Sequence, residues 1–218
     1  MAKINYVEPY PRFSISNSKL GPSIPSVNQP AGITCALGVP CTKDCYASEH
    51  HGNYRFTSVQ TSLRKNLEAY LNSPTDFFNL IIAKLHMIPY KYFRWHSSGD
   101  IVNREYFEGM VRVANECPDT KFLCFTKKYD LINTYLDEGL EIPENLTVIF
   151  SHWGNYPVNN KYNLPTSHVR FKKITNECDN SDIPEDAFEC KTFCGDCVAT
   201  GYNCWLMRKG ESVVFNKH

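Results

Sequence analysis

Residues 92–100 read YFRWHSSGD, a short run rich in aromatic residues that ends in a polar, glycine-containing turn. Runs of similar β-type character occupy residues 121–125, 146–150 and 168–171. Stretches with apolar residues at helical spacing separate several of these runs, so strands and helices alternate along the chain. This alternation predicts an α/β fold with a parallel sheet, as a partial or full (β/α) barrel. A doubly wound open sheet is the alternative.

Four helices are predicted from apolar stripes at residues 59–71, 74–88, 107–114 and 131–136. Ser73 before Pro74 is typical of an N-cap followed by proline in the first helical turn. Gly139 is a plausible C-terminal cap for the fourth helix. Residues 1–32 carry five prolines and predict an extended segment that wraps the domain, with short strands around residues 13–15.

The length of 218 residues suits one domain with a small appended module. We expect an α/β domain over residues 1–175 and a cysteine-rich tail over residues 176–218 that packs on the same domain. The formal net charge of zero argues against a protein held on nucleic acid or membranes mainly by long-range charge. There is neither a signal-peptide pattern nor an apolar run of about 20 residues, so we expect a cytoplasmic protein without a membrane partner.

The first of two cysteine groups lies near the N-terminus, with the spacing C-x5-C-x3-C at Cys35, Cys41 and Cys45. In a reducing compartment, clustered cysteines are more often metal ligands than disulfides. Three cysteines without an adjacent fourth suit a cubane iron–sulfur cluster with one open iron. Alternatively, His50 or His51 closes the set for zinc or for a fully ligated cluster, or the cysteines are simple thiols.

The second group has the spacing C-x3-C-x2-C-x6-C at Cys190, Cys194, Cys197 and Cys204. Four cysteines within fifteen residues form a complete ligand set. An iron–sulfur cluster is the favoured interpretation and zinc is the alternative. Cys178 is close enough in sequence to serve as a spare ligand.

Polar residues follow three consecutive predicted strands, at residues 96–100, 126–128 and 151–154. The carboxyl ends of parallel strands meet at one edge of a sheet, where functional groups gather. These three segments are therefore expected to contact one ligand. Within them, Lys127 and His152 are candidate substrate-handling groups, together with Arg94 on the first of the strands.

Three features resemble a family of bacteriophage proteins named for gene product eighty-eight: the Cys-Tyr-Ala end of the first loop at residues 45–47, the HSSGD turn at 96–100 and the tail that ends in residues 215–218. The most specific matches are C-x3-C-Y-A at residues 41–47 and C-G-D-C at residues 194–197, followed by Cys-Trp. The resemblance covers about residues 20–218. More distantly, the chain resembles radical S-adenosylmethionine (radical-SAM) proteins with a similar loop.

The radical-SAM resemblance implies that the first cysteine loop holds a [4Fe-4S] cluster whose open iron binds S-adenosylmethionine. Ser98, Gly99 and Asp100 stand where such enzymes carry a Gly-Gly-Glu-type segment, so they are expected to contact the cofactor, with Arg94 beside them. The expected catalytic residues are Asp100, Lys127 and His152. The second cysteine group would correspond to an auxiliary cluster. The chain departs from that pattern in its first cysteine spacing and in having Asp in place of Glu.

Two other functions stay open from the sequence. One is an iron–sulfur protein that does not use S-adenosylmethionine, with a redox, Lewis-acid or structural role. Such a protein would bind nucleic acid through Arg170, Lys172 and Lys173 with nearby Tyr162 and His168, although a solvated strand edge explains the same residues. The other is a zinc-stabilised structural or host-interaction protein. An enzyme would require a small-molecule or macromolecular substrate and an electron donor as partners, and a phage-encoded protein would work in the host cytoplasm.

Overall fold

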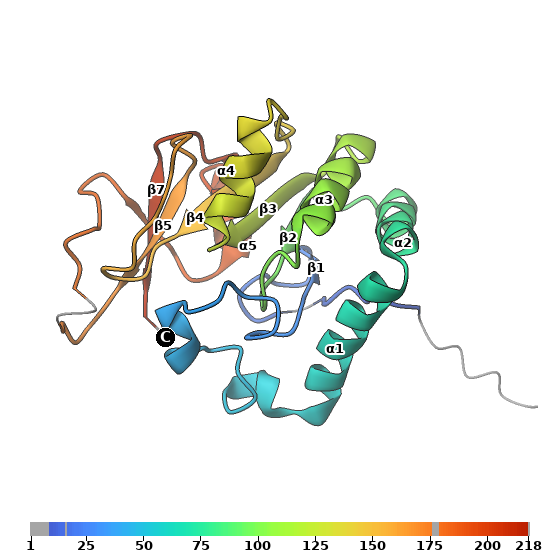
Figure 1. Ribbon diagram of the computed structural model, residues 1–218, viewed down its shortest axis with the longest axis horizontal. Coiled ribbons are helices and arrows are strands. Elements are labelled where there is room, and N and C mark those ends of the chain that lie inside the picture. The colour runs from blue at the N-terminus through green and yellow to red at the C-terminus, as the bar shows by residue number, and fades with distance from the viewer. Residues whose placement is uncertain (1–8, 16, 176–178, 218) are drawn as a thin grey trace, which may run out of the picture.

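A seven-stranded parallel sheet forms the centre of the computed structural model, which describes residues 9–15, 17–175 and 179–217 (Figure 1). The strand order is β1-β2-β3-β4-β5-β7-β6, and every neighbouring pair is parallel. The strands are β1 (Ser26–Val27), β2 (Tyr92–Trp95), β3 (Lys121–Thr126), β4 (Leu146–Ser151), β5 (Thr166–Arg170), β6 (Phe188–Glu189) and β7 (Ser212–Asn216). Because β1 and β6 are edge strands, the sheet is open and forms a partial barrel. The predicted α/β class with a parallel sheet is confirmed.

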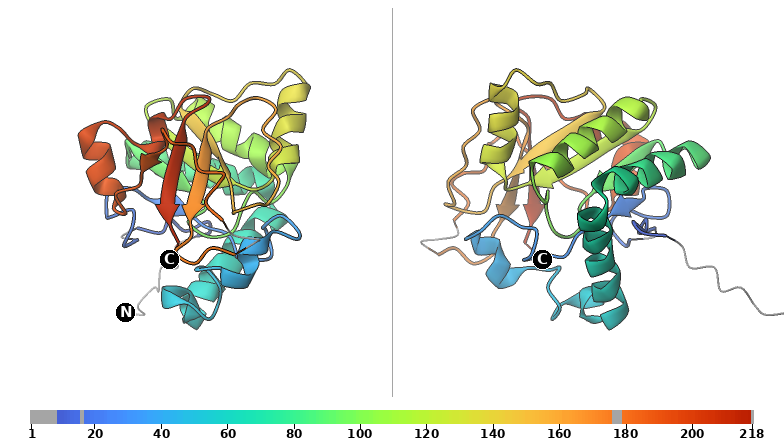
Figure 2. Two further views of the ribbon diagram at one scale, coloured as in Figure 1. Left: turned by 90° about the vertical axis from the view of Figure 1, so that its left-hand side faces the viewer. Right: turned by 45° about the vertical axis from the view of Figure 1, so that its right-hand side comes forward.

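Four helices on one side of the sheet contribute to the larger hydrophobic core, and a fifth helix lies on the other side (Figures 1 and 2). The four are α1 (Thr57–Asn72), α2 (Pro74–Met87), α3 (Arg104–Glu116) and α4 (Tyr129–Asp137), and the fifth is α5 (Cys194–Thr200). Three short 3-10 helices are η1 (Pro40–Asp44), η2 (Gly52–Arg55) and η3 (Cys204–Leu206). In the described part of the chain, none of the helices has the length and apolar character needed to cross a membrane.

Local sequence signals set the ends of the predicted helices. The Ser73 hydroxyl accepts a hydrogen bond from the backbone N–H of Asp76, and Pro74 occupies the first position of α2. Gly139 follows α4 with a φ of +78°, a conformation that glycine adopts without steric cost. The helix predictions are confirmed, including the cap at Ser73.

The central strands are buried on both faces, and alternate residues enter two separate cores. On the helix side, the aromatic rings of Phe93, Trp95 and Phe122 pack on one another at centroid distances of 5.1 Å to 6.3 Å. On the opposite side, Leu123 and Ile149 face the cysteine-rich tail. The second core is completed by Leu20, Ile24, Trp205, Met207 and Val213.

Several elements differ from the sequence expectation. The strand predicted at residues 168–171 begins earlier, at Thr166. Residues 13–15 form no strand, and Ser14 makes only an isolated bridge to Ser26. The tail contributes β6 and β7 to the same sheet as the preceding domain. The possible ligand Cys178 lies outside the described residues.

Candidate functional site

The first cysteine loop leaves the carboxyl end of β1 and reaches α1 through η1 and η2. Cys41 lies within η1, which begins at Pro40, and Cys35 and Cys45 flank it. The backbone N–H of Gly32 points at the Cys35 sulfur, at a distance of 3.4 Å. All three cysteines are partly exposed and form no disulfide, so their thiols are available to a ligand.

The three thiols of this loop lie close enough to influence one another electrostatically. Burial raises the pKa of Cys35, and the charges of Asp100, Cys45 and Cys41 raise it further, against the lowering effect of the Gly32 hydrogen bond. Burial likewise raises the pKa of Cys41, whereas the ammonium group of Lys127 lowers it. Three thiolates in this loop would therefore repel one another unless a cation neutralised them.

The spacing of these sulfurs is wider than mononuclear zinc requires. Tetrahedral zinc with Zn–S bonds of about 2.3 Å places its sulfurs about 3.8 Å apart. Among the described residues, only one set of three or more His, Cys, Asp and Glu ligand atoms lies entirely within 4.8 Å, and it contains no cysteine. A cubane binds its cysteines at separate iron corners, so it accommodates the wider spacing.

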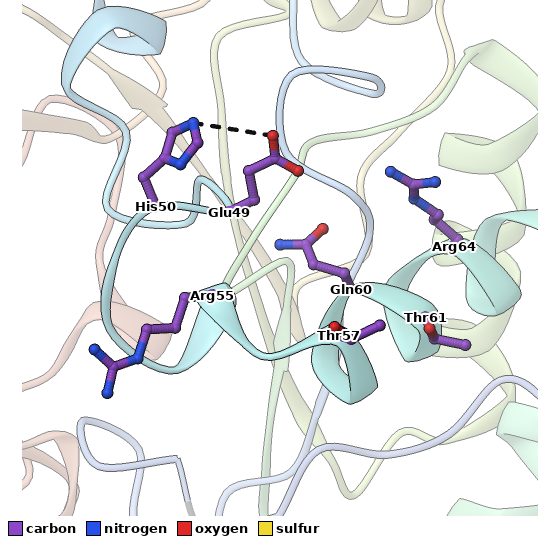
Figure 3. Close-up of a pocket in the computed structure, with 7 residues that line it drawn as sticks. All are labelled: Glu49, His50, Arg55, Thr57, Gln60, Thr61 and Arg64. Atoms are coloured by element: carbon purple, nitrogen blue, oxygen red, sulfur yellow. Dashed lines mark ion pairs between the residues drawn. The ribbon is translucent and has the colours of Figure 1, made fainter.

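His50, a candidate fourth ligand, lies beside a different cavity of about 330 Å³ (Figure 3). Its Nε2 lies 3.9 Å from Oε1 of Glu49, and its side chain is 80% exposed. The cavity is lined by Glu49, His50, Arg55, Thr57, Gln60, Thr61 and Arg64, so none of the predicted cysteine ligands contributes to it.

The turn after β2 packs tightly against the start of the cysteine loop. Gly99 has a φ of +73°, and a Cβ atom there would lie 2.6 Å from both the Gln29 carbonyl oxygen and Thr34 Oγ1. The Ser98 hydroxyl donates a hydrogen bond to the same Gln29 carbonyl, at 2.7 Å. Tyr46, next to Cys45, donates its hydroxyl to the Ser97 carbonyl at 2.6 Å. The turn and the cysteine loop are thus held together by direct hydrogen bonds.

The Asp100 carboxylate connects this turn to the end of β3. Its Oδ2 accepts a hydrogen bond from the backbone N–H of Lys127 at 3.0 Å, and its Oδ1 accepts one from Ile101 at 2.7 Å. The backbone N–H of Asp100 donates to Thr34 Oγ1 at 3.0 Å. Burial raises the pKa of Asp100, although these hydrogen bonds oppose the shift. In this structure, Ser98 and Asp100 position the cysteine loop.

Lys127 and His152 lie at the same edge of the sheet as the first cysteine loop. Lys127 Nζ is 6.0 Å from the Trp153 ring centroid. Its charge opposes the burial that raises the pKa of Cys41, and it adds to the burial that lowers the pKa of His152. Lys217 approaches the same ring at 5.8 Å and pairs with Asp44 of η1 at 2.8 Å. The structure therefore places Lys127 near the cysteine loop and His152 near Lys127.

Arg94, by contrast, lies on the other face of the sheet. Its guanidinium stacks over the Phe125 ring at 4.3 Å, and its Nε donates to the Trp95 carbonyl at 3.1 Å. Its charge counters the burial that raises the pKa of Cys194. Arg94 therefore neighbours the second cysteine group.

The four cysteines of the second group gather on that opposite face. Burial raises the pKa of Cys204 to about 12, and the charges of Cys190, Cys194 and Cys197 contribute to the rise. Backbone structure fixes the positions of two of these cysteines. The N–H of Cys190 donates to the carbonyl of Val214 in β7 at 3.0 Å, and Cys194 is the first residue of α5. Because the charges of Cys190, Cys194 and Cys197 all act on Cys204, the structure brings the four predicted ligands together.

Trp205 attaches the second group to the sheet. Its side chain is 2% exposed and its Nε1 donates to the Phe93 carbonyl of β2 at 2.8 Å. Thr147 of β4 donates its hydroxyl to the Trp205 carbonyl, also at 2.8 Å. Since Cys204 immediately precedes Trp205, its position is fixed by the core.

The residues considered for nucleic-acid binding are largely engaged with acidic partners. Arg170 pairs with Glu189, and the Tyr162 hydroxyl bonds to Asp137. His168 is 2% exposed and contacts Asp182, a residue that the sequence interpretation did not include. No sequence spacing links Asp182 to His152 and His168, because they meet only through the pairing of β4 with β5.

Comparison with known proteins gives one match. A protein-family model described as gene product 88 matches residues 8–194, which include the first cysteine loop, the strands β1 to β6 and two cysteines of the second group. No curated protein and no solved structure matches the chain.

Proposed function

The chain belongs to the gene product 88 family of phage proteins, and on that premise we propose that it is an iron–sulfur enzyme of the radical-SAM type. Cys35, Cys41 and Cys45 hold an open [4Fe-4S] cluster, and the second cysteine group holds a closed one. One observation carries the proposal: three partly exposed thiols gather at the carboxyl edge of a parallel sheet, more widely spaced than zinc requires.

When bound, such an open cluster offers one iron to S-adenosylmethionine and supplies the electron that cleaves it. The chain's own residues position this site. Tyr46, Ser98 and Asp100 connect the cysteine loop to the ends of β2 and β3. Lys127 places a positive charge beside Cys41, which stabilises the thiolate form required of a ligand.

Substrate would enter next to Trp153, whose ring lies within about 6 Å of the ammonium groups of Lys127 and Lys217. An indole ring with two ammonium groups near it suits a flat or anionic group. His152, whose pKa burial lowers to about 4, is neutral at pH 7 and offers a nitrogen lone pair there.

The second cysteine group is suited to an auxiliary cluster. Four thiolates carry more negative charge than the metal centre they hold, and Arg94 and Lys19 lie near enough to lower the pKa of Cys194. These cations reduce the cost of holding that charge in a half-buried site.

An iron–sulfur protein that does not use S-adenosylmethionine is the second candidate. The observation in its favour is that Ser98 and Asp100 direct their hydrogen bonds into the protein. In that case the open iron would act as a Lewis acid or redox centre.

Metal analysis and electron paramagnetic resonance (EPR) spectroscopy on protein purified without oxygen test the proposal. We expect about eight irons and about eight acid-labile sulfides per chain, and a reduced-state spectrum that changes when S-adenosylmethionine is added. An unchanged spectrum with the same iron content would favour the second candidate. Zinc in place of iron in both sites would refute both.

A further inference from the structure

Two histidines and an aspartate meet at the junction of β4 and β5, which are neighbours in the sheet (Figure 1). His152 directly follows β4, His168 lies within β5 and Asp182 belongs to the loop after β5. One ligand atom from each of the three lies within 4.8 Å of the other two. No cysteine takes part, so this cluster is distinct from the two cysteine groups, and it shares His152 with the candidate site beside the first of them.

The distances within the cluster match those around a single metal ion. His168 Nδ1 lies 3.0 Å and His152 Nδ1 lies 3.5 Å from the same oxygen, Oδ2 of Asp182. Ligands about 2.1 Å from a metal are about 3.0 Å apart at right angles and about 3.4 Å apart in a tetrahedron. The centroids of the two imidazole rings are 4.3 Å apart and the rings are inclined by 34°. Both rings direct Nδ1 at Oδ2 of Asp182.

The far side of His168 carries the support expected of a metal ligand. Its Nε2 is 3.1 Å from Thr166 Oγ1, which in turn is 2.7 Å from the Ser212 hydroxyl. With the Nε2 proton donated to Thr166, Nδ1 has a free lone pair facing Asp182. A ligating histidine is typically oriented in this way by a hydrogen bond from its other nitrogen.

Asp182 has one carboxylate oxygen without a partner. Among the described residues, its buried Oδ1 atom finds no hydrogen-bond donor. A buried acceptor without a partner costs about 1–3 kcal/mol, and a bound cation would remove that cost. The loop that carries Asp182 is fixed through Asn180, whose side chain bonds to both the N–H and the carbonyl of Phe171 at 2.8 Å and 3.1 Å.

We propose that His152, His168 and Asp182 bind one divalent first-row metal ion of the zinc class. Two imidazoles and a carboxylate are ligands that zinc and ferrous iron share, and three protein ligands leave a coordination position for water or substrate. The ion would fasten the loop after β5 to the ends of β4 and β5. Because His152 follows the carboxyl end of β4 and the first cysteine loop follows the carboxyl end of β1 in the same parallel sheet, the ion would lie at the same edge as that loop.

Calorimetric titration of the full-length, anaerobically purified protein with zinc tests this site. Asp182→Asn removes the charged ligand with little change in shape, and His152→Gln removes a second ligand that is only partly buried. Asp179→Asn is the matched control, because Asp179 lies in the same loop and its carboxylate is hydrogen-bonded to Ser181 and Asn155, neither of which is a proposed ligand. Any zinc bound by cysteines is common to all four proteins, so only differences between them are interpreted.

We expect wild type and Asp179→Asn to bind one zinc ion that Asp182→Asn and His152→Gln bind at least about tenfold more weakly. Circular dichroism should show all four proteins equally folded. Equal zinc affinity and stoichiometry in all four would overturn the proposal and leave a hydrogen-bonded His-Asp-His cluster. This outcome is independent of iron content, so it does not depend on the proposed function.

Discussion

The two cysteine groups lie at different places on one sheet, the first at its carboxyl edge and the second on one face, and they are supported in different ways. The first is a loop at the carboxyl edge, held by hydrogen bonds from Tyr46, Ser98 and Asp100. The second is part of a hydrophobic core that contains Trp205, Leu123 and Ile149. Under the proposed function, we expect the first loop to keep its fold without a metal, whereas in the second group the metal and the core would stabilise each other.

Under the proposed function, this difference distinguishes a site for chemistry from a site for stability. An open cluster must be reachable by a cofactor, and all three cysteines of the first loop are partly exposed. A closed cluster needs no access, and in the second group Cys197 is buried, whereas Cys190, Cys194 and Cys204 are partly exposed. Four substitutions test this comparison, from the largest expected effect on stability, that of Cys197→Ala, to the smallest, that of Cys41→Ala.

The largest loss is expected from Cys197→Ala. Alanine is compatible with α5, so the main effect is loss of a metal ligand, and metal binding to a folded site contributes directly to folding free energy. We expect a loss of several kcal/mol, which lowers Tm by roughly 10 °C or more in a chain of this size. Thermal unfolding followed by circular dichroism measures this change.

Cys117→Ala is the matched control, because Cys117 is also buried and follows a helix but belongs to neither cysteine group. It should lower Tm by only a few degrees, through loss of one buried sulfur. Equal Tm values for the two variants would contradict the structural role of the second group.

The next effect concerns acid stability near the first group. Burial, with the charges of Arg94 and Lys128, lowers the pKa of His96 to about 3 from 6.5. Between these values the unfolded chain binds a proton that the folded chain does not, so the free energy of unfolding falls as the pH falls through that window. Above pH 6.5 both states are neutral and the effect vanishes.

His96→Asn should therefore lessen the loss of stability on acidification, by about 1–2 kcal/mol between pH 7 and pH 5. Asparagine tolerates the positive φ of 57° at this position. Urea unfolding at the two pH values measures the difference. A parallel loss in both proteins would show that His96 is not the acid-sensitive group.

Much of the fold could be predicted from the sequence because its signals are local. The cap formed by Ser73 and Pro74 and the aromatic run at residues 92–95 depend on neighbouring residues alone. β1 was missed because its two residues form a strand only through pairing with Arg94 and Trp95, which are distant in sequence. β6 has only two residues and forms a strand only through pairing with β7, so no local pattern marks it. The strand β7 was also not predicted, although residues 213–215 are of β-type character.

The same distinction applies to the candidate site. Both cysteine groups are visible in the sequence because their members are close together in the chain. The partners of Ser98 and Asp100 were not predictable, since Gln29 and Thr34 lie 69 and 66 residues away. The proximity of Asp182 to the two histidines was not predictable either, because it depends on the order of the strands in the sheet.

A loss of stability smaller than that of Cys197→Ala is expected from Gly99→Ala. Its Cβ would lie 2.6 Å from the Gln29 carbonyl oxygen and from Thr34 Oγ1, so the turn and the cysteine loop must move apart. The expected cost is about 1–3 kcal/mol, measured by urea unfolding. Gly139→Ala is the control, because it has a similar φ of +78° with no atom within 4 Å of the added Cβ. If Gly99→Ala and Gly139→Ala lower the free energy of unfolding equally, the close contact between the turn and the cysteine loop is not the reason that residue 99 is glycine.

The smallest effect on stability is expected from Cys41→Ala, although its effect on metal content is large. Cys41 is partly exposed in η1, and the hydrogen bonds that hold the loop use other residues, so Tm should change by no more than about 3 °C. About half of the iron and sulfide should be lost, because one of two clusters loses a ligand. Iron and sulfide analysis beside thermal unfolding measures both quantities, and Cys197→Ala provides the contrast. Full retention of iron in Cys41→Ala would exclude a cluster in the first loop. A fall in Tm as large as that of Cys197→Ala would instead show that the first loop also depends on its metal for folding, and the two groups would then differ in position but not in role.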